Sequence, residues 1–167
     1  DGGSLVMSPN GNVFEEMSYF KESIKTFDLT KVKKGKISKE QPKGKMKRIH
    51  DALVLGIKDY FEKLGFKKAI LGLSGGIDSA LTVVLAAKAL GRNNVRVVLM
   101  PSQYSSGHSI NDAVELAENL DIQYDIVPIK NIYKTYMKEL KPLFGDLPFN
   151  VTEENIQARG RGMILMA

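Results

Sequence analysis

The hydrophobic pattern changes its period along the chain and divides it into two parts. In residues 1–19, two short apolar runs flank Asn10 and Gly11, a pair that favours the tight turn of a β-hairpin. In residues 46–66, apolar side chains recur at helical spacing, ahead of a glycine that can end a helix. These apolar positions are Ile49, Leu53, Ile57, Tyr60, Phe61 and Leu64. We therefore expect a hairpin, followed by an amphipathic helix whose apolar stripe faces a core.

Beyond residue 66, short apolar runs alternate with helical patterns. The expected strands lie within residues 67–74, 95–101 and 122–129, and the expected helices are 77–90, 110–120, 131–144 and one from about Thr152. A capping box of Ser109 and Asp112 would start one helix, and Pro142 would break another. Strands that are almost wholly apolar are typical of a parallel sheet covered by helices on both faces. The pattern predicts an α/β fold, in which a three-layer domain with a parallel sheet follows a short β-hairpin remnant.

Composition and charge narrow the class of protein. The chain has 167 residues, no cysteine and a formal net charge of +5. Residues 31–48 hold nine Lys or Arg residues and one acid, so the positive charge belongs to a Gly/Pro/Lys-rich linker. This linker lacks the interleaved aromatic side chains that stack on bases, so we expect no nucleic-acid partner. The lack of cysteine excludes a thiolate metal site and a cysteine nucleophile within these residues.

Two further expectations concern location and completeness. No apolar stretch is long enough to cross a bilayer, and the first residues lack the pattern of a secretory signal. We therefore expect a cytoplasmic protein that does not enter a membrane. Because the chain opens on Asp1 and stops inside a helical pattern, we also expect it to be part of a longer protein.

Residues 71–80, LGLSGGIDSA, carry the candidate chemistry, because an apolar strand meets a helical pattern there. Open α/β sheets bind their ligands at such carboxyl ends of strands. The two glycines allow a tight turn and a close approach of the backbone, and the free N–H groups of the new helix favour an anion. Ser74 and Ser79 can add hydroxyl donors, and Asp78 supplies the hard oxygen that Mg²⁺ prefers. The stretch predicts a site for a metal-bound polyphosphate.

The spacing within this loop selects among known phosphate-binding loops. No Lys follows the glycines as in a Walker loop, and the G-x-G-x-x-G spacing of dinucleotide-binding loops is absent. The pattern S-G-G-x-D-S instead resembles the ATP-pyrophosphatase loop, found in enzymes that cleave ATP between the α and β phosphates. A glycine turn with a helix-capping Asp or Ser is the alternative without a function.

Two other stretches indicate which of these enzyme families the chain resembles. Residues 99–122, LMPSQYSSGHSINDAVELAENLDI, and residues 154–167, ENIQARGRGMILMA, resemble segments of the glutamine-dependent NAD synthetases, the second of them an E-N-x-Q-A-R-x-R-G signature. Residues 1–16 are similar to the closing strands of the nitrilase-like glutaminase domain in the long form of that family. The resemblance implies an adenine-nucleotide α-hydrolase-like fold. It divides the chain into the end of a glutaminase domain (1–28), a basic linker (29–45) and the first part of the synthetase domain (46–167).

The resemblance also implies a reaction, an ATP-dependent amidation. The carboxylate of nicotinic acid adenine dinucleotide would attack the α-phosphorus of ATP and release pyrophosphate. Ammonia, free or from glutamine, would then displace AMP from the acyl-adenylate to give NAD. The residues implied in ATP binding are Gly72, Leu73, Ser74, Gly75, Gly76, Ile77, Asp78 and Ser79, and Asp78 would also bind Mg²⁺. Asn155 and Arg159, four positions apart and so on one helix face, would bind the dinucleotide; no catalytic residue is assigned.

The resemblance further implies what lies outside the chain. The Cys, Glu and Lys of the glutaminase would lie upstream, and a later Thr and Glu that bind ATP and metal would follow Ala167. The family assembles through its synthetase domains, so we expect a homo-oligomer. Gly160 replaces a bulky residue common in the family and would weaken its helix by about 1 kcal/mol. A GMP or asparagine synthetase type of enzyme and a non-catalytic nucleotide-binding fragment are the alternatives.

Overall fold

The computed structural model describes residues 2–34, 44–145, 148 and 150–167. The chain falls into two compact units, residues 1–56 and residues 57–167. Within the described ranges, no helix is both long enough and apolar enough to cross a membrane.

A short antiparallel hairpin opens the first unit. β1 (Leu5–Met7) pairs with β2 (Val13–Glu16), which confirms the predicted hairpin. Gly11 has a positive φ of 79° but Asn10 does not, so the connection is not the two-residue turn that the sequence suggested. The short helix α1 (Leu29–Lys33) follows and is capped by an aspartate side chain at its N-terminus.

The helix α2 (Lys45–Leu64) forms as predicted, but its apolar stripe is not buried. None of its residues is buried, and Leu53 in the middle of the stripe is 48% exposed. The expectation that this stripe faces a core was therefore wrong for the described part of the chain. The reason is that other helices build the two buried clusters around the sheet of the second unit.

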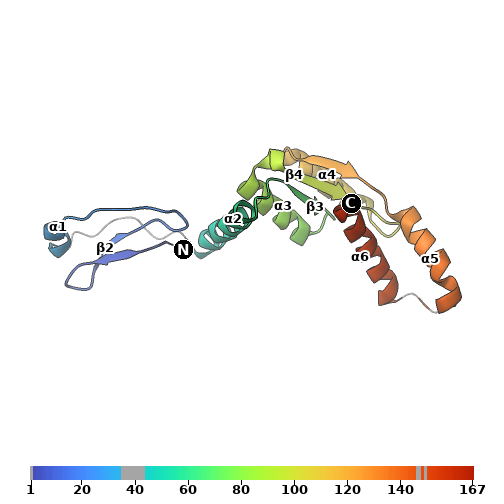
Figure 1. Cartoon of the computed structure of the whole chain (residues 1–167), viewed down its shortest axis with the longest axis horizontal. Helices are drawn as coiled ribbons and strands as arrows, with labels where there is room; N and C mark the ends of the chain where they lie inside the picture. The colour runs from blue at the N-terminus through green and yellow to red at the C-terminus, as the bar shows by residue number, and fades with distance from the viewer. Residues whose placement is uncertain (1, 35–43, 146–147, 149) are drawn as a thin grey trace. The chain divides into compact units, whose positions relative to one another are not determined.

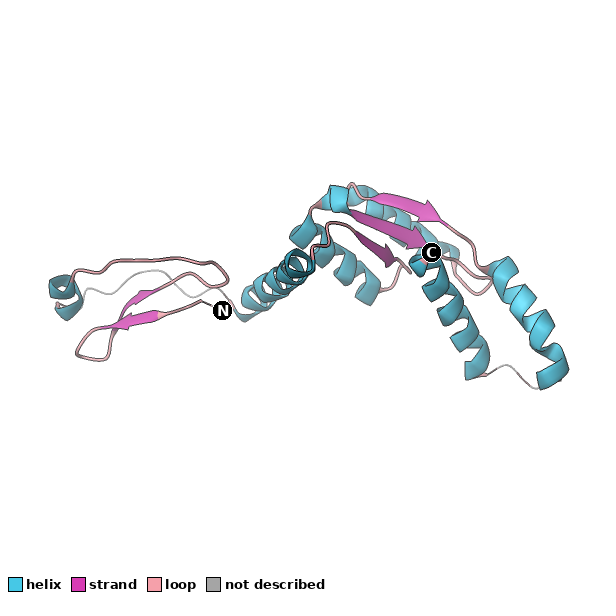
Figure 2. Ribbon diagram, in the orientation of Figure 1, coloured by secondary structure: helices cyan, strands magenta, loops and turns pink. Residues whose placement is uncertain are grey.

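A parallel sheet forms the centre of the second unit (Figure 2). Its strands β3 (Ala69–Gly72), β4 (Val95–Leu99) and β5 (Gln123–Ile126) pair in the order β3-β4-β5. Both pairings are parallel, with Leu71 opposite Val97 in the first of them. The carboxyl ends of all three strands therefore lie along one edge of the sheet, and the predicted α/β class is confirmed.

Two helices cover one face of this sheet. α3 (Ile77–Leu90) follows β3, and α4 (Gly107–Asn119) follows β4. A single-turn 3-10 helix, η1 (Arg92–Asn94), leads from α3 into β4. The buried core between these helices and the sheet consists of Leu73, Val83, Ala86, Val95, Val97, Leu99, Ala113, Ala117 and Ile122. Small residues of α4 in this core let the helix approach the sheet closely.

A third layer covers the opposite face. α6 (Val151–Met166) packs Ile164 against a buried cluster that includes Val98 and Met100. These two side chains alternate along the chain with those that face α3 and α4, so they point to the other side of the sheet. α5 (Lys130–Phe144) lies beside α6 (Figure 1). The arrangement confirms the three layers predicted from the apolar strands.

Two predicted helix boundaries differ from the structure. The N-cap of α4 is Ser106, whose side chain accepts a hydrogen bond from the Ser109 N–H at 3.1 Å. The capping box predicted at Ser109 was therefore wrong, because Ser106 offers the same hydroxyl one turn earlier. The break predicted at Pro142 was also wrong, since α5 continues through it. Pro142 lies in the last turn, and α5 ends two residues later at Phe144.

The helix α6 has a strong start and no interruption. Asn150 accepts a hydrogen bond from the Thr152 N–H at 2.8 Å, and Glu153 accepts one from the Asn150 N–H at 2.8 Å. This reciprocal pair is a capping box. Gly160 is buried within the helix, which runs through it unbroken. The weakening expected at this glycine therefore does not end the helix.

Candidate functional site

The predicted phosphate loop lies at the carboxyl edge of the sheet. β3 ends at Gly72 and α3 begins at Ile77, so the glycines lie in the connection between them. Leu73 is 3% exposed and belongs to the core, which anchors the first residue of the loop. Gly76 is the N-cap of α3 and offers no capping side chain. The first N–H groups of α3 are therefore left for a ligand, and the helix dipole favours an anion there.

The loop is held against the start of α4 by the close approach of two backbones. Gly75 has a φ of +80°, and a Cβ atom on it would lie 2.1 Å from the carbonyl oxygen of Ser109. Gly76 has an ordinary φ, and a Cβ there would meet only the Ser74 hydroxyl, at 3.4 Å. Gly75 is thus required by backbone conformation and by packing against α4, a reason that the sequence alone did not reveal.

The two serines of the loop bond to each other. The Ser79 hydroxyl donates to the carbonyl oxygen of Gly76 at 2.9 Å, and its oxygen lies 2.9 Å from the Ser74 hydroxyl. The Gly76 N–H in turn donates to the Ser74 hydroxyl at 3.3 Å. Both hydroxyl hydrogens are therefore used within the loop. The sequence suggested that the two serines present free hydroxyl donors. In the structure their hydroxyl groups instead order the loop.

Asp78 lies in the first turn of α3 and is exposed. No other described residue forms an ion pair or hydrogen bond with its carboxylate, and no three His, Cys, Asp or Glu side chains of the described ranges are grouped to hold a metal ion. Mg²⁺ is commonly bound through one or two carboxylates, water and substrate phosphates, without a complete protein cage. A free carboxylate beside a phosphate loop fits that mode of binding, so Asp78 is suited to Mg²⁺.

Two adjoining cavities lie at the same edge of the sheet. The first, of about 400 Å³, is lined by Gly72, Leu73, Ser74, Leu99, Met100, Pro101, Ser105, Ser109, Ile110, Ala113, Ala158, Arg161, Gly162 and Leu165. The second, of about 660 Å³, is lined by Ser102, Tyr104, Ser105, Glu154, Gln157 and Arg161. Ser105 and Arg161 belong to both. Both cavities have the size of small-molecule sites, and the first begins where the loop leaves β3.

Aromatic packing forms one side of the second cavity. The rings of Tyr104 and Tyr133 meet edge to face, with their centroids 6.3 Å apart. Tyr133 is 6% exposed. Its burial, together with a hydrogen bond to Tyr104, raises the pKa of Tyr133 to about 12. The hydroxyl of Tyr133 is therefore protonated at neutral pH.

The two residues predicted to bind the dinucleotide lie on the exposed side of α6. Asn155 and Arg159 are both exposed, and neither lines the two cavities. Arg161, which was not among the predicted residues, points toward the sheet and donates from Nε to the carbonyl oxygen of Met100 at 3.1 Å. Gln157 precedes Arg161 by one helical turn and lies on the same face of α6, but only the structure shows that this face is the buried one.

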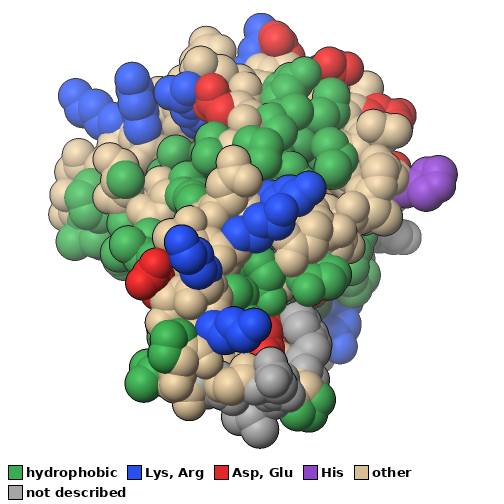
Figure 3. Space-filling view, turned by 90° about the vertical axis from the view of Figure 1, so that its right-hand side faces the viewer, with side chains coloured by type: hydrophobic (Ala, Val, Ile, Leu, Met, Phe, Trp, Pro, Cys, Tyr) green, Lys and Arg blue, Asp and Glu red, His purple; other side chains and the backbone are tan. Residues whose placement is uncertain are grey.

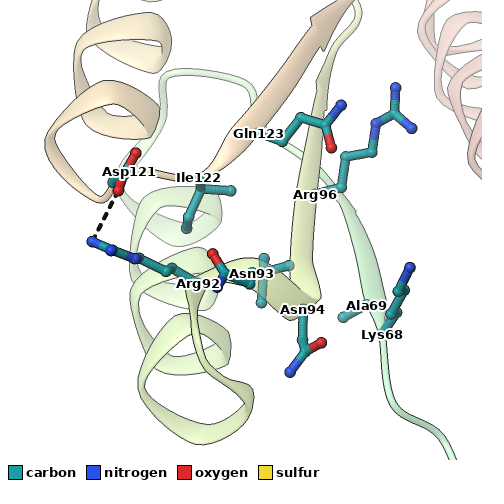
Figure 4. Close-up of a pocket in the computed structure, with 10 residues that line it drawn as sticks. Lys68, Ala69, Arg92, Asn93, Asn94, Arg96, Asp121, Ile122 and Gln123 are labelled. Atoms are coloured by element: carbon teal, nitrogen blue, oxygen red, sulfur yellow. Dashed lines mark ion pairs between the residues drawn. The ribbon is translucent and has the colours of Figure 1, made fainter.

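At the opposite edge of the sheet, the arginine side chains are paired with carboxylates. A hollow of about 490 Å³ there is lined by Lys68, Ala69, Arg92, Asn93, Asn94, Val95, Arg96, Asp121, Ile122 and Gln123 (Figure 4). Arg92 forms an ion pair with Asp121 at 2.9 Å, and Arg96 donates two hydrogen bonds to Asp125 at 2.5 and 2.9 Å. Both guanidinium groups are thus neutralised by carboxylates.

Comparisons with known proteins agree on one family. The family model described as NAD synthase matches residues 49–167. The glutamine-dependent NAD(+) synthetase of Synechocystis is 46% identical over the whole chain, which covers 30% of that protein.

Two solved structures of NAD synthetases are also similar to this chain. A glutamine-dependent NAD+ synthetase from Acinetobacter baumannii, in complex with ADP, has a TM-score of 0.91 at 40% identity. The match covers 99% of this chain and 32% of the Acinetobacter chain. An NH3-dependent NAD synthetase from Campylobacter jejuni has a TM-score of 0.65 at 31% identity, covering 74% of this chain and 51% of its own. The chain thus spans about a third of the glutamine-dependent relatives that it matches.

Proposed function

Because the chain belongs to the NAD synthase family, we propose that it supplies part of an enzyme that amidates nicotinic acid adenine dinucleotide to NAD at the cost of ATP. The observation that carries this proposal is the S-G-G-x-D-S loop, placed at the carboxyl edge of the sheet beside a cavity of about 400 Å³. The ADP complex of a relative that is 40% identical supports the choice of an adenine nucleotide.

The first proposed role is binding of the ATP phosphates by residues 72–79. The N–H groups at the start of α3 have no capping side chain and lie at the end of the loop that follows β3. As pyrophosphate departs, negative charge grows on the β and γ phosphates, and fixed N–H dipoles stabilise that charge without reorganising. Asp78 would hold Mg²⁺, which supplies charge neutralisation on the phosphates when bound.

The second proposed role is activation of the carboxylate. An oxygen of the nicotinate carboxylate bonds to the α-phosphorus while the bond to the pyrophosphate oxygen breaks. Ammonia then attacks the acyl carbon, AMP leaves with the former carboxylate oxygen, and the ammonium proton passes to solvent. The nitrogen comes from glutamine or from free ammonia, because relatives named for each source resemble this chain. The glutaminase itself would lie outside the chain.

Asn155 and Arg159 are proposed to bind the dinucleotide from the exposed side of α6. An exposed pair on a helix surface does not enclose a ligand by itself, so a second copy of the protein would complete the site. Exposed apolar side chains on α5 and α6, among them Leu143 and Met163, support a homo-oligomer. Figure 3 shows apolar side chains mixed with basic ones on one face of the molecule.

We place the enzyme in the cytoplasm.

A substrate panel tests this function. The full-length protein is incubated with ATP, Mg²⁺ and ammonium, together with nicotinic acid adenine dinucleotide, xanthylate or aspartate. The proposal predicts NAD, AMP and pyrophosphate with the dinucleotide and no turnover with the other two acids. Amidation of xanthylate or aspartate would assign the chain to a GMP or asparagine synthetase type of activity, and ADP as the product would reject the whole class.

A further inference from the structure

Arg161 differs from the other arginines near the sheet because it is partly buried and has no carboxylate partner among the described residues. Its Nε donates to the carbonyl oxygen of Met100, which fixes the side chain against the end of β4. Among the described residues, no Asp or Glu forms an ion pair with it. Arg92 and Arg96, at the opposite edge, both have such partners. A cation that is half-buried and unpaired indicates a site awaiting an anion.

The surroundings of Arg161 are consistent with this reading. Burial lowers the pKa of the Arg161 guanidinium from its ordinary value, and no carboxylate in the described part of the chain acts in the other direction. An arginine nevertheless stays charged at neutral pH. With Nε used by Met100, its two terminal nitrogens remain as donors, in the planar fork that fits two oxygens of one phosphate.

The position of Arg161 indicates which phosphate it would meet. It lines the cavity of about 400 Å³ that also includes Gly72 and Ser74, the residues that enter the phosphate loop. The amide groups of α3 begin at Ile77, at the other end of the loop that Gly72 and Ser74 enter. A nucleoside in the cavity would therefore place its first phosphate between Ser74 and Arg161, with the outer phosphates toward α3.

We propose that Arg161 binds the α-phosphate of the adenine nucleotide through its terminal guanidinium nitrogens. The inference rests on the proposed function, since it assumes that the cavity beside the loop receives the nucleoside of ATP. In that reaction the α-phosphorus is attacked, and AMP carries the same phosphate away. Arg161 would contact this group in ATP, in the acyl-adenylate and in AMP, so its effect should appear in the binding of both free nucleotides.

Calorimetric titration of the full-length protein with adenosine, AMP and ATP tests the inference. Arg161→Gln should weaken AMP and ATP about ten- to a hundredfold, the usual effect of losing hydrogen bonds to a charged group, and should leave adenosine within about threefold. Arg161→Lys should show an intermediate loss, because the charge remains without the fork. Arg92→Gln, which removes an exposed cation at the other edge of the sheet, is the matched control and should bind all three ligands normally.

Each other outcome overturns the assignment. Equal losses for adenosine, AMP and ATP, with a lower Tm, would make Arg161 a structural link between α6 and β4. A loss confined to ATP would place it on the outer phosphates, and unchanged affinities would remove it from the site. If the unsubstituted protein binds no adenine nucleotide, the proposed function fails and the inference with it, whereas the preceding results would overturn the inference alone.

Discussion

Gly75 and Ser109 approach so closely that a single added methyl group would bring two atoms to 2.1 Å. The contact joins the phosphate loop to the first turn of α4, so the conformation of one depends on the position of the other. Because Gly75 also has a φ of +80°, both backbone strain and steric overlap oppose any larger residue there. The shape of the loop is therefore set by packing as well as by its own turn.

Gly75→Ala should destabilise the protein strongly. Strain at a positive φ and overpacking each cost about 1–3 kcal/mol, so we expect a loss of roughly 2–5 kcal/mol in the free energy of unfolding. Denaturant unfolding of the full-length protein measures this change. Gly76→Ala is the matched control for stability and should cost less than about 1 kcal/mol, since its φ is −85° and its nearest contact is a serine hydroxyl. Equal losses for the two variants would show that the contact with Ser109 is unimportant.

Asp78→Asn should strongly lower activity and leave the stability of the protein almost unchanged. The side chain is exposed and has no described partner, so the loss of one carboxylate near a helix N-terminus should cost less than about 1 kcal/mol. Pyrophosphate release with Mg²⁺ should fall at least about a hundredfold, because the proposed metal ligand is gone. Glu115→Gln on the exposed surface of α4 serves as the control for a neutralised acid. Near-normal turnover in Asp78→Asn would contradict the proposed role in metal binding.

The raised pKa of Tyr133 predicts that the folded protein loses stability at high pH. Burial and the hydrogen bond to Tyr104 raise its pKa to about 12 from an ordinary value of 10.0. Between these values the unfolded chain releases the phenolic proton and the folded chain keeps it, so stability falls as the pH rises from 10 to 12. Thermal unfolding across this range, with Tyr133→Phe as the comparison, measures the effect. The idea fails if the variant, which cannot ionise here, loses stability with the same pH profile.

The capping box of α6 predicts a specific effect on stability. Asn150→Ala removes the acceptor of the Thr152 N–H and should cost about 1 kcal/mol, whereas Asn150→Ser keeps a capping oxygen and should cost less. Circular dichroism during denaturation compares the two variants. If alanine and serine behave alike, the cap does not contribute to the stability of α6.

Much of the fold could be predicted because the signals are local. The hairpin, the parallel strands and the start of α6 follow from alternation, apolar runs and turn residues. The position of Arg161 could not be predicted in this way. Two arginines lie close together in the sequence, and the packing of α6 against the sheet, through Ile164 and Leu165, brings Arg161 rather than Arg159 to the sheet. The E-N-x-Q-A-R-x-R-G signature indicated Arg159 instead.

The remaining errors also depend on distant contacts. The apolar stripe of α2 has the spacing of a core-facing helix, but the second unit builds its core with other helices. Likewise, the glycines of the loop suggested space for a ligand, although Gly75 meets the backbone of a residue far along the chain. Local patterns identify which residues are unusual, while the partner of each residue is set by the tertiary fold.

An isotope-transfer measurement shows whether the carboxylate of the dinucleotide attacks the α-phosphorus of ATP. Nicotinic acid adenine dinucleotide labelled with ¹⁸O in its carboxylate is incubated with the full-length protein, ATP, Mg²⁺ and ammonium, and the products are analysed by mass spectrometry. If the carboxylate attacks the α-phosphorus, each AMP formed carries one ¹⁸O atom and pyrophosphate carries none. Label in inorganic phosphate, with ADP as the other product, or unlabelled AMP accompanying the formation of NAD, would contradict the account.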